Sequence, residues 1–354
     1  MVSDTAGGAG SENQARRFPL TTAEGWRGFV DDQVPEPKQL SEQDLELLTP
    51  AGRAAREAER LEYHARLIVA ATPVVRHVYA TGRRLVLLNR HEISASRGLI
   101  VTGAPGTGKT TAVTQLGRNY ELLQRARLGP AAMRGRMPVV YVTVPPAATP
   151  KMLATEFAVF AGLQPHPRQN QTAITNAVCD VLARVQADLV IVDEIHNLDL
   201  GTRLGADSSD QLKYLAERIR ATFVYAAINA AGGGLFAGIR GQQIAGRFGA
   251  ITCENFGYRT EAQRKDWKSL VLTFDQALRL RRHPAGHLVT LDAYLHERTN
   301  GMIGSLSHLI RGAAVEAILD ASEKITKRTL DAVGLDQAAD ATRRTRRTSG
   351  KTGA

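Results

Sequence analysis

The chain contains few cysteines, few aromatic residues and no long apolar run. Its two cysteines, Cys179 and Cys253, stand far apart in 354 residues, which excludes a disulfide framework and the ligand spacing of a zinc site. Aromatic residues make up 5% of the chain. We therefore do not expect its main function to be the binding of single-stranded nucleic acid by stacking of bases on aromatic rings. The N-terminus lacks the apolar stretch of a signal sequence, and no run reaches transmembrane length. We therefore expect a soluble cytoplasmic protein with no membrane partner.

The composition indicates a folded protein, and the charge favours an anionic partner. Hydrophobic residues make up 43% of the chain, enough for one large domain and a smaller one. The formal net charge is +10 and the sequence pI is about 9.8. Nucleic acid is the commonest anionic partner of such a chain, although the same charge could serve solubility alone.

One stretch combines a short strand, a glycine-rich loop and a helix. Leu99–Val101 is an apolar, partly β-branched run, typical of a buried parallel strand. The pattern G-x-x-x-x-G-K-T follows over residues 103–110, and residues 111–123 have helical spacing. The alternative is a chance glycine-rich turn, but the strand directly before the loop and the helix directly after it disfavour this alternative. We therefore interpret the loop as a phosphate-binding loop, or Walker A motif.

The residue types in this loop suit ATP with Mg²⁺. Glycines let successive backbone N–H groups point at phosphate oxygens, and the helix N-terminus adds its positive dipole end. Lys109 would reach the β- and γ-phosphates, and the Thr110 hydroxyl would ligate Mg²⁺. The residues that we expect to bind the nucleotide here are Gly103, Ala104, Pro105, Gly106, Thr107, Gly108, Lys109, Thr110 and Thr111.

Apolar strands alternate with helices after this loop, which predicts a parallel α/β sheet covered by helices on both faces. Ligand sites of such sheets lie at the carboxyl ends of the strands, where Thr102, Asp193 and Asn229 stand. The predicted strands cover residues 138–144, 189–192 and 223–228, and the predicted helices cover residues 150–162 and 172–186.

Two acids follow the strand 189–192 and form a second nucleotide motif, the Walker B pattern. Asp193 would hold Mg²⁺, directly or through water. Glu194 would act as the general base that orients and deprotonates the attacking water. Asn229 would be a polar sensor that helps to position this water. The alternatives are ordinary strand-end acids and a turn-forming asparagine; the upstream phosphate loop favours the catalytic interpretation, and thus an ATPase that yields ADP and phosphate.

Three further residues are candidates for roles near the nucleotide. Arg247 is the first choice, and Arg240 the second, for an arginine finger that reaches a neighbouring subunit's γ-phosphate. A surface arginine is the alternative. His196 completes the sequence Asp-Glu-Ile-His, which is found in helicases. Because no other helicase motif is present, a helix-start or core histidine is the favoured interpretation.

The N-terminal part has a different pattern. Residues 1–17 are polar and glycine-rich and are expected to be disordered. Residues 18–48 carry scattered apolar side chains, which fits either an extended arm that docks in pieces or a loose linker. Residues 50–79 are predicted to be helical, with a break near Pro73. Their alternating charges are typical of a solvated helix face, and a basic stripe facing DNA is the alternative.

The C-terminal part, from about Thr260, shows helical patterns alone, over residues 261–279, 289–298, 303–319 and 325–333. These helices predict a small helical domain, followed by a basic tail. The expected parts are a partly disordered arm (1–60), a nucleotide-binding α/β domain (61–257), a helical lid (258–340) and a disordered basic tail (341–354).

These features together resemble an AAA+ ATPase, with its three-layer parallel sheet and helical lid. Within that class the chain is similar to the TniB/TnsC group of transposition ATPases, relatives of MuB and IstB. The resemblance covers roughly residues 67–333. The stretches that carry it are Arg97–Ile100, Asp193–Leu198 followed by Gln211–Leu215, Ile244–Phe248 and, in the lid, Thr299–Ile310.

The lid departs from the pattern of this class in one respect. Many AAA+ lids place a sensor arginine three residues after the lid glycine. Counted from Gly304, that position is Ser307, and Arg311 lies one turn further along. Arg311 is therefore the candidate substitute.

The resemblance implies a DNA-binding regulator of transposition. ATP-bound subunits would assemble as a ring or filament on duplex DNA, contact its backbone without reading the sequence, and recruit a transposase of the DDE type. Hydrolysis would release the assembly. Lys151 is the candidate DNA contact, with a solvated helix-start lysine as the equal alternative. Two other functions stay open: an AAA+ ATPase of another pathway, such as a helicase loader or a defence or signalling switch acting on a protein partner, and a nucleotide-gated scaffold with negligible turnover.

Overall fold

The computed structural model of the chain describes residues 18–33, 35–66, 68–93, 96–198, 203–228 and 246–335. The chain folds into two compact units. The first unit comprises residues 1–32, 73–105 and 109–253, and the second comprises residues 33–72, 106–108 and 254–354.

The first unit is built on a five-stranded sheet whose neighbouring strands are all parallel. The strand order is β2-β3-β4-β1-β5, so the predicted parallel sheet is confirmed. The strands are β1 (Gly98–Gly103), β2 (Val139–Thr143), β3 (Leu189–Asp193), β4 (Thr222–Ile228) and β5 (Phe248–Cys253).

The edge strand β5 was not predicted from the sequence. Four of its six residues are not buried; Ile251 and Cys253 are buried in the core, and the partly buried Phe248 packs against it. An edge strand that buries so little has neither an apolar run nor a clear alternation. By contrast, β1 is buried along its whole length, as expected for a strand covered on both faces.

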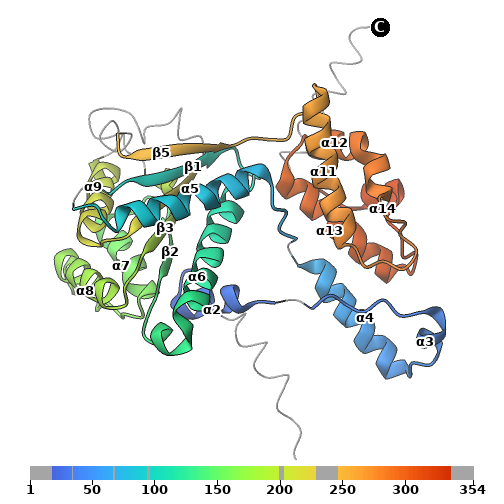
Figure 1. Ribbon diagram of the computed structural model, residues 1–354, viewed down its shortest axis with the longest axis horizontal. Helices are drawn as coiled ribbons and strands as arrows, with labels where there is room; N and C mark the ends of the chain where they lie inside the picture. Colours follow the sequence, from blue (N-terminus) through green and yellow to red (C-terminus); the bar gives the residue numbers. More distant parts are fainter. Residues whose placement is uncertain are drawn as a thin grey trace, which may run out of the picture. The chain divides into compact units, whose positions relative to one another are not determined.

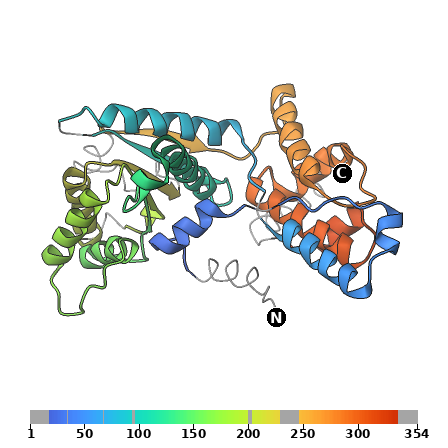
Figure 2. The same cartoon turned by 60° about the horizontal axis from the view of Figure 1, so that its bottom comes forward.

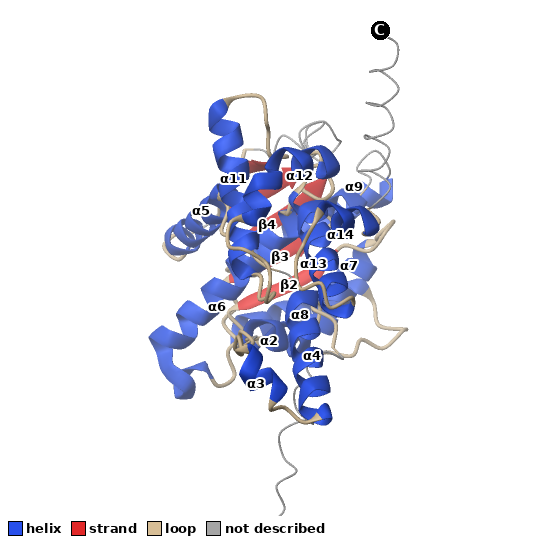
Figure 3. Cartoon of the chain, turned by 90° about the vertical axis from the view of Figure 1, so that its right-hand side faces the viewer, coloured by secondary structure: helices blue, strands red, loops and turns tan. Residues whose placement is uncertain are grey.

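Helices cover both faces of this sheet, which confirms the predicted three layers (Figure 3). Two helices pack against each other on one face, and three pack together on the other. The first pair is α5 (Pro73–Asn89) and α6 (Lys109–Met133); the others are α7 (Pro150–Phe160), α8 (Gln171–Arg184) and α9 (Arg203–Arg218).

The order of the strands determines where a ligand site can form. Strand β4 lies between β1 and β3, with Gly103 opposite Ile228 and Val192 opposite Tyr225. All three strands run in the same direction, so the phosphate loop after Gly103 and the acids after β3 emerge at one edge of the sheet.

An N-terminal helix also belongs to the first unit. Helix α2 (Ala23–Asp31) begins after Thr22, whose hydroxyl accepts a hydrogen bond from the Gly25 N–H. It lies beside α6 (Figures 1 and 2) and buries Trp26 and Val30, each 1% exposed. Helix α2 thus docks the N-terminal segment on the first unit. The scattered apolar residues in this segment did not predict the helix.

The second unit is helical, and a common core of Trp267, Phe274, Leu306 and Ile310 holds it together. In the part of the chain that the structure describes, no single helix is long and apolar enough to cross a membrane, although the bent pair 287–299 and 303–319 passes on length and composition. The helices are α3 (Glu42–Glu46), α4 (Pro50–Ala65), α11 (Glu261–Ala277), the 3₁₀ helix η3 (His287–Leu291), α12 (Asp292–Thr299), α13 (Ile303–Leu319) and α14 (Lys327–Ala332).

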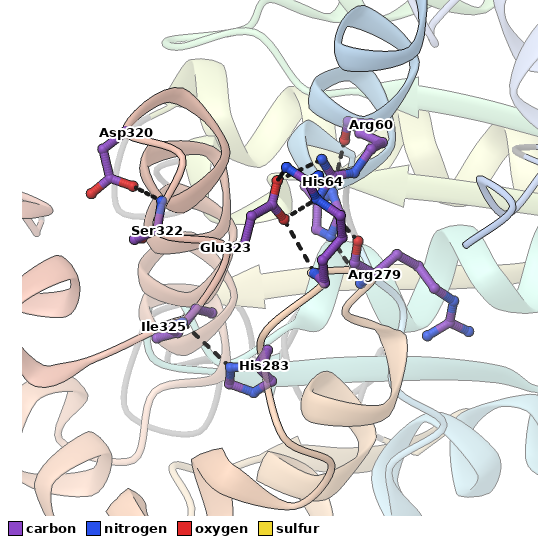
Figure 4. Close-up of polar contacts among 9 residues, drawn as sticks. Arg60, His64, Arg279, His283, Asp320, Ser322, Glu323 and Ile325 are labelled. Carbon is purple, nitrogen blue, oxygen red and sulfur yellow. Dashed lines mark hydrogen bonds and ion pairs between the residues drawn. The ribbon is translucent and has the colours of Figure 1, made fainter. Parts of the chain in front are cut away.

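Residues 33–72 belong to this helical unit, where a buried ion pair fixes α4 (Figure 4). Both terminal nitrogens of Arg60 donate to the two carboxylate oxygens of Glu323, and Arg281 Nη2 donates to Glu323 Oε1 at 2.7 Å. Burial opposes the charge of Glu323, but these hydrogen bonds prevail and lower its pKa to about 2.

His64, one turn along α4, makes a second connection. The backbone N–H of Arg279 donates to His64 Nε2 at 3.0 Å, and His64 Nδ1 lies 2.7 Å from the Arg60 carbonyl oxygen (Figure 4). Burial lowers the pKa of His64, so the ring is held in its neutral form. The predicted break near Pro73 is therefore the point where the chain passes from the helical unit to α5 of the first unit.

Candidate nucleotide-binding site

The loop after β1 has the backbone that a phosphate-binding loop requires. Gly106 and Gly108 have φ angles of 76° and 89°, a region that residues with a Cβ atom rarely adopt. Helix α6 begins immediately afterwards at Lys109, so its free N–H groups and positive dipole end face the loop. Thr110 is exposed at this first turn.

The Lys109 side chain is buried beside the loop. It is 8% exposed, and its Nζ donates to the Ala104 carbonyl oxygen at 2.7 Å. Burial lowers the pKa of Lys109, whereas the nearby Cys253, Glu194 and Asp193 act in the opposite direction. The ammonium group and the two acids therefore share one electrostatic environment, although the lysine comes from the start of α6 and the acids from the end of β3.

Asp193 is held in place by two hydrogen bonds. It is 3% exposed at the end of β3, and Tyr141 Oη donates to its Oδ2 at 2.9 Å. The Glu194 backbone N–H donates to its Oδ1 at 2.8 Å. Mg²⁺ prefers such hard oxygen ligands and uses one or two protein groups together with phosphates and water. The Asp193 carboxylate and the Thr110 hydroxyl fit this requirement.

Glu194 has a strained backbone, and its carboxylate is held by His196. Its φ angle is 57°, which costs a residue with a side chain about 1–3 kcal/mol and is typical of functional sites. Its Oε2 lies 3.2 Å from His196 Nε2. The Ile228 N–H at the end of β4 donates to His196 Nδ1 at 3.4 Å, which leaves the ring proton on Nε2, facing Glu194.

His196 lies in the 3₁₀ helix η1 (Ile195–Asn197) directly after the acids. Its side chain is 29% exposed, so it is not a core histidine. Asn229 and Arg240, two of the residues predicted for the catalytic centre, lie outside the described residues; their roles stay predictions.

Arg247 lies where the strands begin, opposite the carboxyl ends of the strands, where the phosphate loop lies. It precedes β5, and its carbonyl oxygen accepts a hydrogen bond from the Gly98 N–H at 3.1 Å. Since β1 runs from Gly98 to Gly103, the two ends of the strand are about 16 Å apart. Arg247 Nη1 lies 3.5 Å from Glu217 Oε1 at the surface. As an arginine finger, Arg247 would therefore act on the nucleotide of a neighbouring subunit. This role stays a prediction.

Two further candidates make local contacts. Lys151 Nζ donates to the Pro167 carbonyl oxygen at 2.8 Å, and its DNA contact stays a prediction. Arg311 Nη2 donates to the Ala65 carbonyl oxygen at the end of α4, within the helical unit. Ser307 is 4% exposed and its hydroxyl has no hydrogen-bond partner among the described residues, so the sensor position holds a core residue.

Tyr141 is a residue of this site that the sequence did not reveal. A strand was predicted over residues 138–144, with no role for the Tyr141 hydroxyl. A polar signal was available, because a tyrosine in a buried strand needs a hydrogen-bond partner for its hydroxyl. Only the pairing of β2 with β3 identifies that partner as Asp193.

Comparisons with known proteins agree with this geometry. Residues 92–231 match the family model described as an AAA domain. The chain is similar to the ORC1 protein of Aeropyrum pernix in complex with DNA, with a TM-score of 0.56 and 16% identity over 80% of this chain and 69% of that chain. It is also similar to the ORC2 protein of the same organism (ADPNP-ADP complexes), with a TM-score of 0.55 and 16% identity over 76% and 70%.

The sequence matches none of the curated proteins with which it was compared. At these identities the likeness to solved structures shows the fold alone. The family match over residues 92–231, the strand order and the phosphate loop agree, and the chain has the AAA+ P-loop NTPase fold.

Proposed function

We propose that the chain is an ATPase that binds ATP with Mg²⁺ at the loop between β1 and α6. The observation that carries this proposal is the convergence of three parts at one edge of the sheet: the phosphate loop, the buried Lys109 ammonium group, and the acids Asp193 and Glu194. In this arrangement a cation faces the phosphates, and a carboxylate remains available to accept a proton.

Each side chain has a distinct task in this proposal. Lys109 leaves the Ala104 carbonyl oxygen and binds the β- and γ-phosphate oxygens. Thr110 and Asp193 hold Mg²⁺, which when bound neutralises charge on the phosphates. Glu194 orients the attacking water and accepts its proton, after its carboxylate turns away from His196 Nε2.

We further propose that this ATPase acts on duplex DNA as a regulator of transposition. Three observations support this finer function: the formal net charge of +10, the resemblance to TniB/TnsC ATPases, and a structural neighbour solved in complex with DNA. ATP-bound subunits assemble as a homo-oligomer on the phosphate backbone, recruit a transposase of the DDE type, and leave the DNA after hydrolysis.

The test is duplex DNA binding by the purified chain, with and without a non-hydrolysable ATP analogue, imaged by electron microscopy and repeated across salt. We expect rings or filaments on DNA only with the analogue, and an affinity that falls steeply as salt rises. Lys109→Ala is the matched control that should prevent assembly. Absence of DNA binding in both states would contradict the DNA function, and stimulation of ATPase activity by a protein alone would favour a partner switch.

A further inference from the structure

Trp26 of α2 occupies a fitted socket in the first unit. Its indole is 1% exposed and its Nε1–H donates to Glu121 Oε2 of α6 at 2.6 Å. One face stacks on the Tyr141 ring, with centroids 5.7 Å apart and planes 15° apart. Opposite the indole, α6 carries Gly117, where an added Cβ would lie 2.6 Å from an indole carbon. The sequence of α6 thus leaves room for this side chain.

Tyr141 connects this socket to the candidate metal ligand. The phenol that stacks on Trp26 donates its hydroxyl to Asp193 Oδ2 at 2.9 Å. The carboxylate therefore has a fixed orientation, set by the ring position of Tyr141 and by the Glu194 N–H.

We propose that Tyr141 is a positioning residue for Asp193 and that α2, through Trp26, holds the Tyr141 ring in place. The N-terminal helix is then a working part of the nucleotide site, because it sets the orientation of a carboxylate that it does not touch. Outer groups that orient a metal ligand usually change metal affinity by about 10–100-fold when they are removed. This inference rests on the proposed function, since it assumes that Asp193 binds Mg²⁺ together with ATP.

The experiment measures the affinity of the full chain for a fluorescent ATP analogue, once with Mg²⁺ and once with EDTA. We expect Tyr141→Phe, which keeps the ring and removes the hydroxyl, to lose about tenfold of the Mg²⁺-dependent gain in affinity. The affinity in EDTA should be unchanged. The matched control is Tyr225→Phe, which removes the hydroxyl of a buried tyrosine on β4, the strand that pairs with β3 on the side away from β2.

A second variant tests the role of α2 and guards against a folding defect at Tyr141. Trp26→Leu should lower the Mg²⁺-dependent gain in the wild-type background. In the Tyr141→Phe background it should cause no further loss, because the two residues act in series. Additive losses would overturn the part of the proposal that concerns α2.

The outcomes separate this inference from the proposed function. If the wild-type chain shows no Mg²⁺-dependent binding of nucleotide, the proposed function fails. If wild type shows the gain, and Tyr141→Phe retains it or binds Mg²⁺ with nucleotide more tightly, the positioning role fails while the ATP site stands.

Discussion

At the scale of single residues, the side chain of Lys109 is the sharpest test of the phosphate loop. Its side chain is buried, and its ammonium group donates to the Ala104 carbonyl oxygen. Lys109→Ala should abolish ATP binding, a loss on the order of 100-fold or more, measured by titration with a labelled nucleotide. Lys268→Ala, which removes an exposed lysine of α11, is the control. Full affinity in Lys109→Ala would refute the loop's assignment.

Glu194 should separate binding from turnover. Glu194→Gln keeps the shape of the side chain but removes the base, so we expect normal ATP binding with hydrolysis slower by about 10²–10⁴-fold. Analysis of the bound nucleotide after incubation should then show ATP in the variant and ADP in wild type. Tight binding with negligible turnover in both proteins would instead favour the nucleotide-gated scaffold.

At the scale of elements, the fit of α2 against α6 depends on Gly117. A methyl group there would lie 2.6 Å from Trp26 and 2.9 Å from Ile191, so Gly117→Ala should destabilise the first unit by about 1–3 kcal/mol through overpacking. Gly249→Ala, where no heavy atom lies within 4 Å of the added methyl, should be nearly neutral. Chemical denaturation measures both, and equal stability of the two variants would argue against the socket.

The docking of α4 within the helical unit should depend on pH. The folded-state pKa of Glu323 is about 2, below its ordinary value of 4.5, so its charge stabilises the helical unit fully above pH 4.5. That contribution, about 3 kcal/mol, is lost as the pH falls from 4.5 towards 2. Burial lowers the pKa of His64, so protonation of the unfolded chain below pH 6.5 weakens the unit in the same direction.

Glu323→Gln isolates this effect. It leaves Arg60 buried without its partner charge, so the variant should lose about 3–5 kcal/mol near neutral pH and much of the acid dependence between pH 4.5 and 2. Glu59→Gln, which removes a surface partner of Arg56 on the same helix, is the control and should retain the acid dependence. Thermal unfolding as a function of pH would contradict the assignment if both variants behaved alike.

At the scale of the whole molecule, Arg247 should matter only in the assembly. Its side chain lies at the sheet edge opposite the phosphate loop and pairs with Glu217 in the single chain. Arg247→Ala should therefore bind ATP normally as an isolated subunit, whereas the assembly should hydrolyse it about 10³–10⁵-fold more slowly. Arg184→Ala, an exposed arginine of α8, is the control. Unchanged turnover by the assembled variant would exclude Arg247 as the finger.

The sequence alone predicted the elements whose signal is local. Each strand between β1 and β4 is a short apolar run, and each of these runs is buried in the structure. Helices α7 and α8 have the expected bounds within a few residues. Helix α6 extends to Met133, beyond the predicted end at residue 123, and helix α9 was not predicted. Strand β5 and helix α2 escaped prediction because each buries only a few residues and carries no continuous pattern.

The phosphate loop and the acids after β3 were determined by the sequence itself, because their chemistry needs neighbouring residues in a fixed order. Tertiary structure alone decided the rest. Tyr141 meets Asp193 across 52 positions, Trp26 meets Glu121 across 95, and Arg60 meets Glu323 across 263. Such contacts depend on strand order and helix docking, which are set by the packing of buried surfaces from distant parts of the chain and leave no local pattern to read.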